Sequence, residues 1–498
     1  MIDVAATLPP FLRDENPGHD RFHEAVELFG LFDYLRQQGI GVFSIRESLQ
    51  AVGECRDGTL QGFHLSDEEA WEAVVFMASL GVGVIELPAY PANPYGQAAN
   101  RRLIERAHAD GLVVSFAAHA RCIEEDIAAA LAAGFGRLHL YIGVSRIKQA
   151  TMRLGPTELA ERAFASIRYA YANGATCVRI STEDAFRTTL SDYEAFYQRL
   201  HECLSASGLR VDGIGIPDTV GVSTIDEMGD RIAVLRRVGI PFSFLECHIH
   251  NDIGTADRMY VDTLLLCQRL GIPMLPDFSI LGIGERNGTI GLSSLLESIY
   301  RRLIQLYPRK MSQIREAMRE KLGTLPSGEL FVNRYRDMDA FFYKILSRTG
   351  FVFDRSPFSA NTEFDGSGVH ADTTRRAYEL AIHEGRSGQT AIDIGNSAYA
   401  GALPPYDMPL RTPVLACFGC GKSNVRFWRE RQQLHLRPHP EIHANLRDLE
   451  GLDDGIVPAQ ITESEADDLA ARLIRYHSVR FNGISHHEAL ELIKIFYQ

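Results

Sequence analysis

This chain of 498 residues lacks several features that would assign it to a simple class. It has no excess of basic residues, since its net charge of −13 argues against nucleic acid or an anionic membrane surface as the main partner. No apolar run approaches the ~18 residues of a membrane span. The N-terminus shows no basic start followed by an apolar run, so no signal peptide is expected.

Paired cysteines are also scarce. The eight cysteines are scattered through apolar segments, and only Cys417 and Cys420 form a C-x-x-C pair. Because no second pair lies nearby, a loop with two thiols is a better interpretation than a zinc site. Scattered reduced thiols suit a cytoplasm better than a disulfide framework, so we expect a cytoplasmic protein.

From residue 40 onward the chain alternates short apolar runs with longer amphipathic ones. Eight such units with short connections predict an α/β fold, a (β/α)8 TIM barrel, with an open doubly wound sheet as the alternative. In a barrel the active site gathers at the C-terminal ends of the strands. The expected strands are 41–47, 82–87, 112–118, 136–142, 175–181, 212–218, 242–250 and 274–281. The expected helices are roughly 66–80, 97–109, 122–134, 155–173, 190–207, 224–238, 254–270 and 288–307.

Segments outside the barrel are expected because the chain is longer than one hydrophobic core usually serves. Residues 1–39 form an N-terminal extension with one helix at about 22–38, and residues 40–307 form the catalytic barrel. Two mostly helical accessory parts follow, a linker subdomain at 308–385 and a C-terminal domain at 386–498. Within them we expect helix over 308–345, a connector rich in glycine, serine and asparagine over 346–372, and a last helix at about 486–497.

The strongest chemical signal is "ECHIHND" at 246–252. Side chains alternate along a strand, so His248 and His250 point to the same face. Two imidazoles at a strand end are half of a site for a divalent metal, which a carboxylate could complete. The competing interpretation is a pair of polar residues at a strand end, one of them bonded to a backbone carbonyl.

Two Arg–acid pairs could supply that carboxylate, Arg46-Glu47 and Arg56-Asp57. The first pair ends the only convincing β run, "GVFSIR". The second lies in "VGECRDGTLQGF", which makes a poor strand but stands at a more usual distance from the helix cap at Ser66. Choosing Glu47 implies a loop of about 18 residues after the first strand, which is longer than usual. We favour Glu47 and leave Asp57 as the alternative.

At this point the chain resembles a known family. "IRESLQ" is similar to the R-[DE]-[GA]-x-Q signature, and "ECHIHNDIGTA" to the HxHND motif, of the DRE-TIM metallolyase superfamily, which is HMGL-like. "VRISTEDAFR", "IPDTVGV", "AHARCIEED" and "LGIGERNG" resemble its homocitrate synthase branch in particular. "FDGSGVHAD" and "GCGKSNVRFW" resemble segments beyond the barrel in isopropylmalate and homocitrate synthases. The resemblance spans about residues 40–430.

The resemblance implies an acyltransferase that condenses acetyl-CoA with a 2-oxo acid, giving a 2-hydroxy-2-carboxymethyl acid and CoA. It also implies a divalent cofactor, which could be zinc, manganese or magnesium. Its expected roles are metal ligation by Glu47, His248 and His250, catalysis by Arg46, Glu183 and His370, and substrate binding by Gln50, His119, Arg179, Ser181 and Thr219. In this family the histidine matching His370 usually reaches the site from a partner subunit, which implies a homodimer.

Arg179 bears on specificity, because an arginine inside the apolar strand "TCVRIS" is costly to bury without an anion. In the homocitrate synthase branch that this chain resembles, the matching arginine engages the distal carboxylate of 2-oxoglutarate, so the resemblance favours a 2-oxo acid with a second anionic group. A structural salt bridge with Glu183 or Asp184 is the alternative.

The chain also departs from the family. Thr289 stands where isopropylmalate synthases place a metal-binding Asn, and a conventional acid is replaced around His139. Oxaloacetate, pyruvate, 2-oxoisovalerate or a phosphonate analogue therefore stay open as substrates, as in isopropylmalate-, citramalate- or phosphonomethylmalate-type synthases. A carbon–carbon lyase on the same scaffold and a non-catalytic paralogue are the alternatives of another class.

Overall fold

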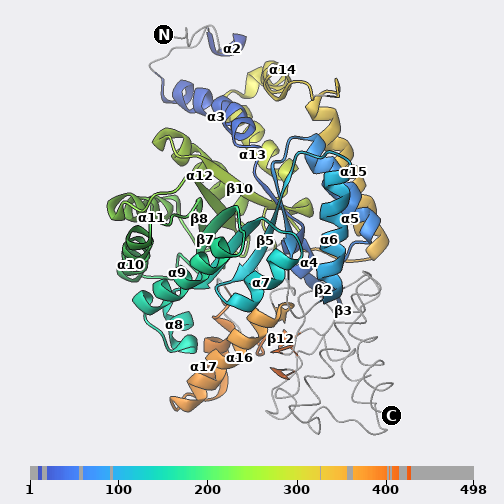
Figure 1. The fold of residues 1–498 in the computed structure, drawn as a ribbon. Coiled ribbons are helices and arrows are strands. Elements are labelled where there is room, and N and C mark those ends of the chain that lie inside the picture. The colour runs from blue at the N-terminus through green and yellow to red at the C-terminus, as the bar shows by residue number, and fades with distance from the viewer. Residues whose placement is uncertain are drawn as a thin grey trace.

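A computed structural model describes residues 9–13, 19–54, 60–89, 94–325, 327–355 and 363–400, together with 403, 407–413, 423, 424, 426 and 427. Its centre is a closed parallel barrel with the strand order β1-β10-β9-β8-β7-β6-β5-β4 (Figure 1). The predicted TIM barrel is therefore confirmed over the open sheet. The strands are β1 Val42–Ser44, β4 Val84–Pro88, β5 Ser115–Arg121, β6 Arg137–Gly143, β7 Cys177–Glu183, β8 Gly213–Asp218, β9 Phe244–Ile249 and β10 Met274–Ser279.

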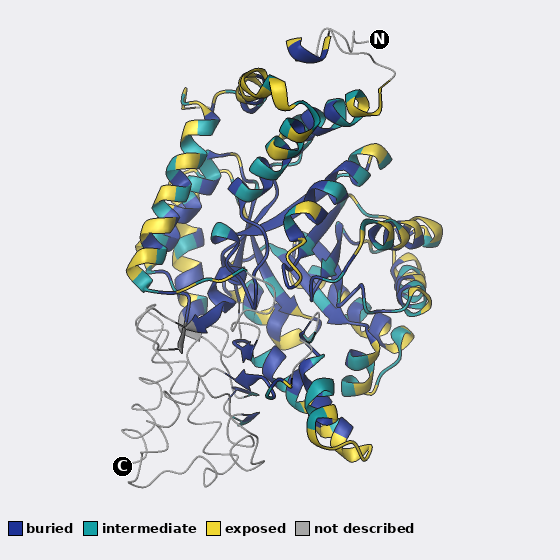
Figure 2. Ribbon diagram, turned by 180° about the vertical axis from the view of Figure 1, so that it is seen from behind, coloured by how far each residue is buried: buried dark blue, intermediate teal, exposed yellow. Residues whose placement is uncertain are grey.

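Helices cover the outside of this barrel, as their amphipathic patterns predict. They are α5 Asp67–Ser79, α6 Pro94–Ala109, α7 Glu124–Ala132, α9 Pro156–Ala172, α10 Leu190–Ser207, α11 Ile225–Val238, α12 Ala256–Leu270 and α13 Leu292–Leu306. Figure 2 shows buried strands inside and exposed residues on the outer helix faces. One helix that the sequence pattern did not predict, α8 Arg146–Met152, lies between β6 and α9.

The first strand is shorter than expected. The run predicted as a strand over 41–47 leaves the barrel at Ser44, and Ile45–Gln50 forms the short helix α4. The hydroxyl of Ser44 caps this helix by accepting a hydrogen bond from the Glu47 amide at 3.1 Å. Arg46 and Glu47 are therefore carried by a helical turn above the strand end.

The chain after α4 forms a small antiparallel hairpin of β2 Val52–Glu54 and β3 Leu60–Gly62. This hairpin accounts for the long connection that the choice of Glu47 implied. Arg56 and Asp57 lie outside the described residues.

The segments outside the barrel are mainly helical. At the N-terminus a short helix, α2 Pro10–Arg13, precedes α3 Asp20–Gln37, where one helix was expected. Beyond the barrel come η2 Pro308–Lys310, α14 Met311–Leu322 and α15 Phe331–Thr349, then β11 Phe364–Asp365, α16 Gly368–His383, α17 Gly388–Asn396 and β12 Thr412–Pro413. The helix α16 packs beside α8 below the barrel in the view of Figure 1.

Some sequence predictions fall outside the described part of the chain. They are the C-x-x-C pair Cys417 and Cys420 and the last helix at 486–497. The proposed domain boundaries stay predictions. Among the described helices, none combines the length and apolar character needed to cross a membrane.

Candidate active site

A pocket of about 590 Å³ opens at the C-terminal ends of the barrel strands. Its walls come from the loops after the strands and from the start of α16. All of the site residues expected from the sequence line it: Arg46, Glu47, Gln50, His119, Arg179, Ser181, Glu183, Thr219, His248, His250 and His370.

Glu47, His248 and His250 come together in one wall of the pocket. One ligand atom of each lies within 4.8 Å of the others, and the group is the candidate metal cluster of the described residues. The Nε2 atoms of the two histidines are 3.1 Å apart, and Nε2 of His248 is 3.7 Å from Oε2 of Glu47. Two imidazole nitrogens converge in this way when they share a metal at about 2.1 Å from each.

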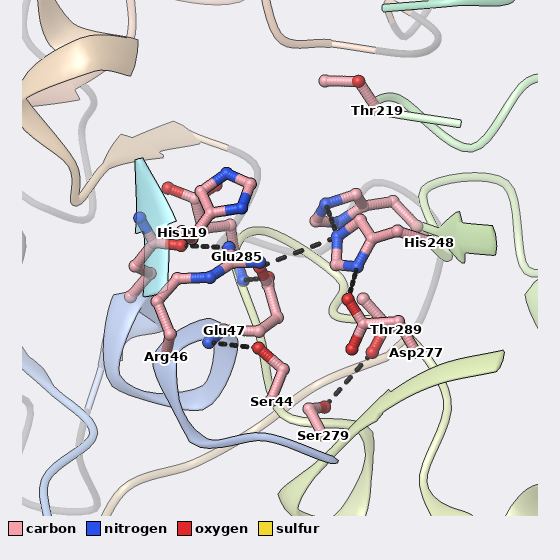
Figure 3. Close-up of polar contacts among 12 residues, drawn as sticks. Ser44, Arg46, Glu47, His119, Thr219, His248, Asp277, Ser279, Glu285 and Thr289 are labelled. Carbon is pink, nitrogen blue, oxygen red and sulfur yellow. Dashed lines mark hydrogen bonds and ion pairs between the residues drawn. The ribbon is translucent and has the colours of Figure 1, made fainter. Parts of the chain in front are cut away.

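The surroundings of the triad also suit a metal ion. Asp277 lies 2.8 Å from Nδ1 of His248, which leaves Nε2 of that ring to face the pocket (Figure 3). Burial, and then the nearby charge of Arg286, hold the pKa of His250 well below its usual value, so this imidazole is neutral as a ligand must be.

Glu47 is held in place by the backbone after β10. Its Oε1 accepts a hydrogen bond from the amide of Glu285 at 2.8 Å. Gly284 makes this approach possible, since a Cβ there would lie 2.4 Å from the same oxygen. The residues present therefore fit a divalent cation.

Arg46 is the centre of a buried hydrogen-bond network beside the triad. Its Nη1 lies 2.6 Å from both Glu47 Oε2 and Gln50 Oε1, and its Nε lies 2.9 Å from Glu86 Oε1. Although burial opposes the ionisation of Glu86, Arg46 and two histidines hold its pKa well below the usual value. The guanidinium is thus fixed next to the candidate metal ligands (Figure 3).

Arg179 is paired inside the chain, and with a different residue from those expected. Its Nη2 forms a salt bridge with Glu246 and not with Glu183 or Asp184, and its Nη1 is 2.9 Å from the hydroxyl of Ser181. The register of the sheet explains this partner. Strand β8 lies between β7 and β9, and Gly215 on β8 is aligned with Glu246 on β9. The missing side chain of Gly215 leaves room for Arg179 to reach Glu246.

The pairing with Glu246 weakens the argument that Arg179 requires a substrate anion. One feature still favours a substrate anion beside Arg179. Its Nε is buried without a hydrogen-bond partner among the described residues.

Four of the expected substrate-binding residues have partners within the chain. The ring of His119 stacks on Tyr141 with centroids 4.3 Å apart, and burial followed by the charge of Arg46 lowers its pKa to about 3. The hydroxyl of Thr219 accepts a hydrogen bond from the Asp184 amide at 2.8 Å. Figure 3 places Thr219 apart from Glu47 and His248. Ser181 accepts a hydrogen bond from Arg179, and Gln50 accepts one from Arg46.

His370 also lines the pocket, on the first turn of α16. Its Nδ1 is 3.1 Å from Oε1 of Glu285, and its ring stacks on Tyr399 with centroids 3.5 Å apart. Burial, and then the charge of Arg286, hold the pKa of His370 well below the usual value, which favours the neutral imidazole.

His370 belongs to the same chain as the barrel whose pocket it lines. The expectation that a partner subunit brings this histidine to the site stays a prediction. The homodimer itself stays a prediction.

Glu183 ends β7 and lines the same pocket as His370. Its Oε1 lies 3.1 Å from Nζ of Lys148 and 2.8 Å from the hydroxyl of Tyr399. The next residue, Asp184, has a left-handed backbone with φ of 65°, a conformation that aspartate tolerates better than most residues. This turn directs the chain away from the barrel directly after Glu183.

Sequence reasoning missed several residues of the site. Glu86, Glu246 and Asp277 are acids inside otherwise apolar strands, and that contrast was the available signal. No comparable signal marks Lys148 or Tyr399, since their positions depend on an unpredicted helix and on the fold beyond the barrel.

Comparison with known proteins identifies the family. The HMGL-like family model matches residues 54–319, which is just over half of the chain. The chain belongs to the HMGL-like family. The resemblance to the DRE-TIM metallolyase superfamily is thereby confirmed.

Curated relatives of this HMGL-like protein carry three kinds of name. The chain is 30% identical over 277 residues to a mitochondrial homocitrate synthase of Schizosaccharomyces pombe, covering 55% of this chain and 61% of that protein. It is 33% identical over 251 residues to a putative (R)-citramalate synthase of Methanopyrus kandleri (49% and 46% covered). It is 32% identical over 249 residues to a 2-isopropylmalate synthase of Rhodopirellula baltica (48% and 44%). The chain thus spans about half of the length of these relatives.

Only one of the two Arg–acid pairs lies within the range matched by the family model. The matched range begins at residue 54, so it includes Arg56 and Asp57 and leaves out Arg46 and Glu47. The geometry places Glu47 against both histidines. The geometry favours Glu47, because ligation requires atoms within reach of one ion.

Proposed function

We propose that this protein is an acyltransferase that condenses acetyl-CoA with a 2-oxo acid in a divalent-metal-dependent Claisen reaction. The observation that carries the proposal is the pocket itself, in which a candidate metal triad with its arginine faces two groups able to handle protons, His370 and Glu183. The synthase names of the relatives support the same reaction class.

Each group has a part in this reaction. A divalent ion held by Glu47, His248 and His250 would polarise the carbonyl of the 2-oxo acid. Arg46 stabilises the negative charge that develops on the keto oxygen. His370, which is neutral, removes a proton from the acetyl methyl group.

The reaction forms one carbon–carbon bond and then cleaves the thioester. The methyl carbon forms a bond with the keto carbon, and the keto oxygen takes up a proton to become a hydroxyl. Water cleaves the thioester to a carboxylate and releases the thiol of CoA, which makes the condensation irreversible. Glu183 is a second proton-handling group beside His370.

The ligand types favour some cations over others. Two imidazoles and one carboxylate suit zinc or manganese better than magnesium, which prefers oxygen ligands. We therefore expect the site to bind zinc or manganese in preference to magnesium.

The oxo acid is proposed to carry a second anionic group, as 2-oxoglutarate does. The unpartnered Nε of Arg179 supports this choice, and the salt bridge to Glu246 weighs against it. The relatives do not decide, because homocitrate, citramalate and isopropylmalate synthases match with similar identity. A homodimer and a cytoplasmic location also belong to the proposal.

A thiol-release assay tests the proposed function. Purified protein with zinc or manganese is mixed with acetyl-CoA and, one at a time, 2-oxoglutarate, oxaloacetate, pyruvate, 2-oxoisovalerate and phosphonopyruvate. We expect CoA release that requires the oxo acid and is fastest with 2-oxoglutarate. Release without any oxo acid would indicate a thioesterase, and no release with any of them would refute the synthase proposal.

A further inference from the structure

A lysine in the pocket wall has no role in the chemistry described so far. Lys148 lies on α8 and has only 4% of its surface exposed. Burying a lysine is costly unless its nitrogen is paired and hydrogen-bonded. The contacts of this side chain therefore indicate why it is there.

The nitrogen of Lys148 meets three oxygens. Nζ lies 3.1 Å from Oε1 of Glu183 and 3.4 Å from the hydroxyl of Thr373, and it also hydrogen-bonds the hydroxyl of Tyr399. It lies 4.2 Å from the centroid of the Tyr399 ring as well. One barrel residue is thus joined through Lys148 to two residues that follow the barrel in the chain.

These contacts orient the carboxylate of Glu183. Its Oε1 accepts hydrogen bonds from both Lys148 and the Tyr399 hydroxyl. Within the described part of the chain no hydrogen bond reaches Oε2, and Glu183 lines the pocket. The oxygen that is not tied to Lys148 and Tyr399 is the one available to a substrate.

The barrel makes room for this lysine at one position. Its stem lies against Gly143 at the end of β6, where a Cβ would come within 2.6 Å of Cγ of Lys148. In the register of β6 with β7, Gly143 is the partner of Glu183. The neighbour of the carboxylate in the sheet is therefore the residue whose missing side chain lets the lysine reach it.

Tyr399 connects the same network to the other proton-handling group, because the ring of His370 stacks on it. We propose that Lys148 is a positioning residue for the condensation, acting through Glu183 and Tyr399 to hold Glu183 and His370 in a fixed position relative to each other. The inference rests on the proposed function, since it assigns Lys148 to that reaction.

The chain offers a matched control in Arg187. Its Nη2 donates to the carbonyl of Ala398 at 2.7 Å, its Nη1 to that of Ser397, and its Nε pairs with Asp184 at 2.7 Å. Arg187 therefore holds the same turn that carries Tyr399, but its described contacts do not include Glu183. The Arg187→Met variant therefore measures the effect of loosening this turn without removing a described contact to Glu183.

The experiment measures kcat and KM by thiol release for wild type, Lys148→Met, Glu183→Gln, the double variant and Arg187→Met. We expect Lys148→Met to lower kcat on the order of 10²-fold with KM for the oxo acid little changed, because misplaced proton-handling groups slow the chemical step. Once Glu183 is glutamine, losing Lys148 should cost less than about 3-fold more, since the two residues act as a unit. Lys148→Arg should restore part of the loss.

Three outcomes would overturn the inference: full activity in Lys148→Met, losses that multiply in the double variant, or an equal kcat loss in Arg187→Met. Retained binding of manganese by Lys148→Met shows that the barrel is folded. Lys148→Gln takes its place in the comparison if Lys148→Met does not bind the metal. A wild type without thiol release contradicts the proposed function itself, whereas an active wild type with an unaffected Lys148→Met contradicts only the role of this lysine.

Discussion

The two walls of the pocket are built in different ways. The metal wall, with Glu47, His248 and His250, comes from the ends of β1 and β9 and is fixed by the hydrogen-bonded barrel. A second wall, which contains His370 and is supported by Tyr399, follows the barrel in the chain and reaches it through side-chain contacts. We expect from this difference that metal binding and proton handling can be removed separately, and the residue that contacts both walls is Glu285, through Glu47 and His370.

The largest effect is expected from Glu47→Gln, because it removes a charged ligand from the metal wall. We expect loss of tightly bound metal and a fall in kcat/KM on the order of 10³-fold or more. Asp57→Asn is the matched control from the competing Arg–acid pair and should leave both properties near wild type. Metal analysis after dialysis and thiol-release kinetics measure the two effects. The reverse result would move the metal site to Asp57.

His370→Ala tests the second wall, which contains the proposed general base. We expect kcat to fall about 10²- to 10⁴-fold, because a general base is lost, while manganese binds as in wild type. Isothermal titration with manganese and the thiol-release assay separate the two properties. A variant that loses its metal together with its activity would mean that the walls are not independent.

Asp277→Asn should have a smaller effect, confined to the metal wall. Asp277 orients His248 from outside the ligand set, and loss of such a group weakens metal affinity about 10- to 100-fold. Activity should return at saturating metal. If activity stays low when the metal site is filled, Asp277 has a role beyond orienting the histidine.

The smallest effect on the overall rate is expected from Glu246→Gln, which frees Arg179 from its salt bridge. This variant should lower KM for oxo acids with a second carboxylate by about 3- to 10-fold relative to pyruvate, because a buried cation is left to pair with substrate. The ratio of kcat/KM for 2-oxoglutarate and pyruvate measures it. An unchanged ratio would remove Arg179 from the specificity argument.

The barrel and the metal wall could be predicted because their signals are local. The alternation of runs gave the eight strands, and the period-2 spacing in "ECHIHND" placed both histidines on one face. The strand over 41–47 was wrong at its end, since Ser44 caps a helix and "IRESLQ" consists mostly of residues that tolerate one. That change still left Glu47 at the C-terminal mouth of the barrel.

The remaining parts of the site depend on contacts that no local pattern carries. Arg179 meets Glu246 because β7, β8 and β9 lie side by side in a register that the sequence does not show. Lys148 and Tyr399 are 251 positions apart and meet only when the segment after α15 folds back on the barrel. His370 could be predicted only from the family resemblance, and its arrival within the same chain could not.

The most direct test of the account is metal dependence measured on a single preparation. Wild-type protein is stripped with a chelator, dialysed, and assayed for thiol release from acetyl-CoA with the best oxo acid before and after adding one equivalent of zinc or manganese. We predict no release from the stripped protein, full recovery with one equivalent, and no recovery for Glu47→Gln treated in the same way. Undiminished release by the stripped wild type, or recovery by Glu47→Gln equal to wild type, would contradict a metal-dependent condensation at Glu47, His248 and His250.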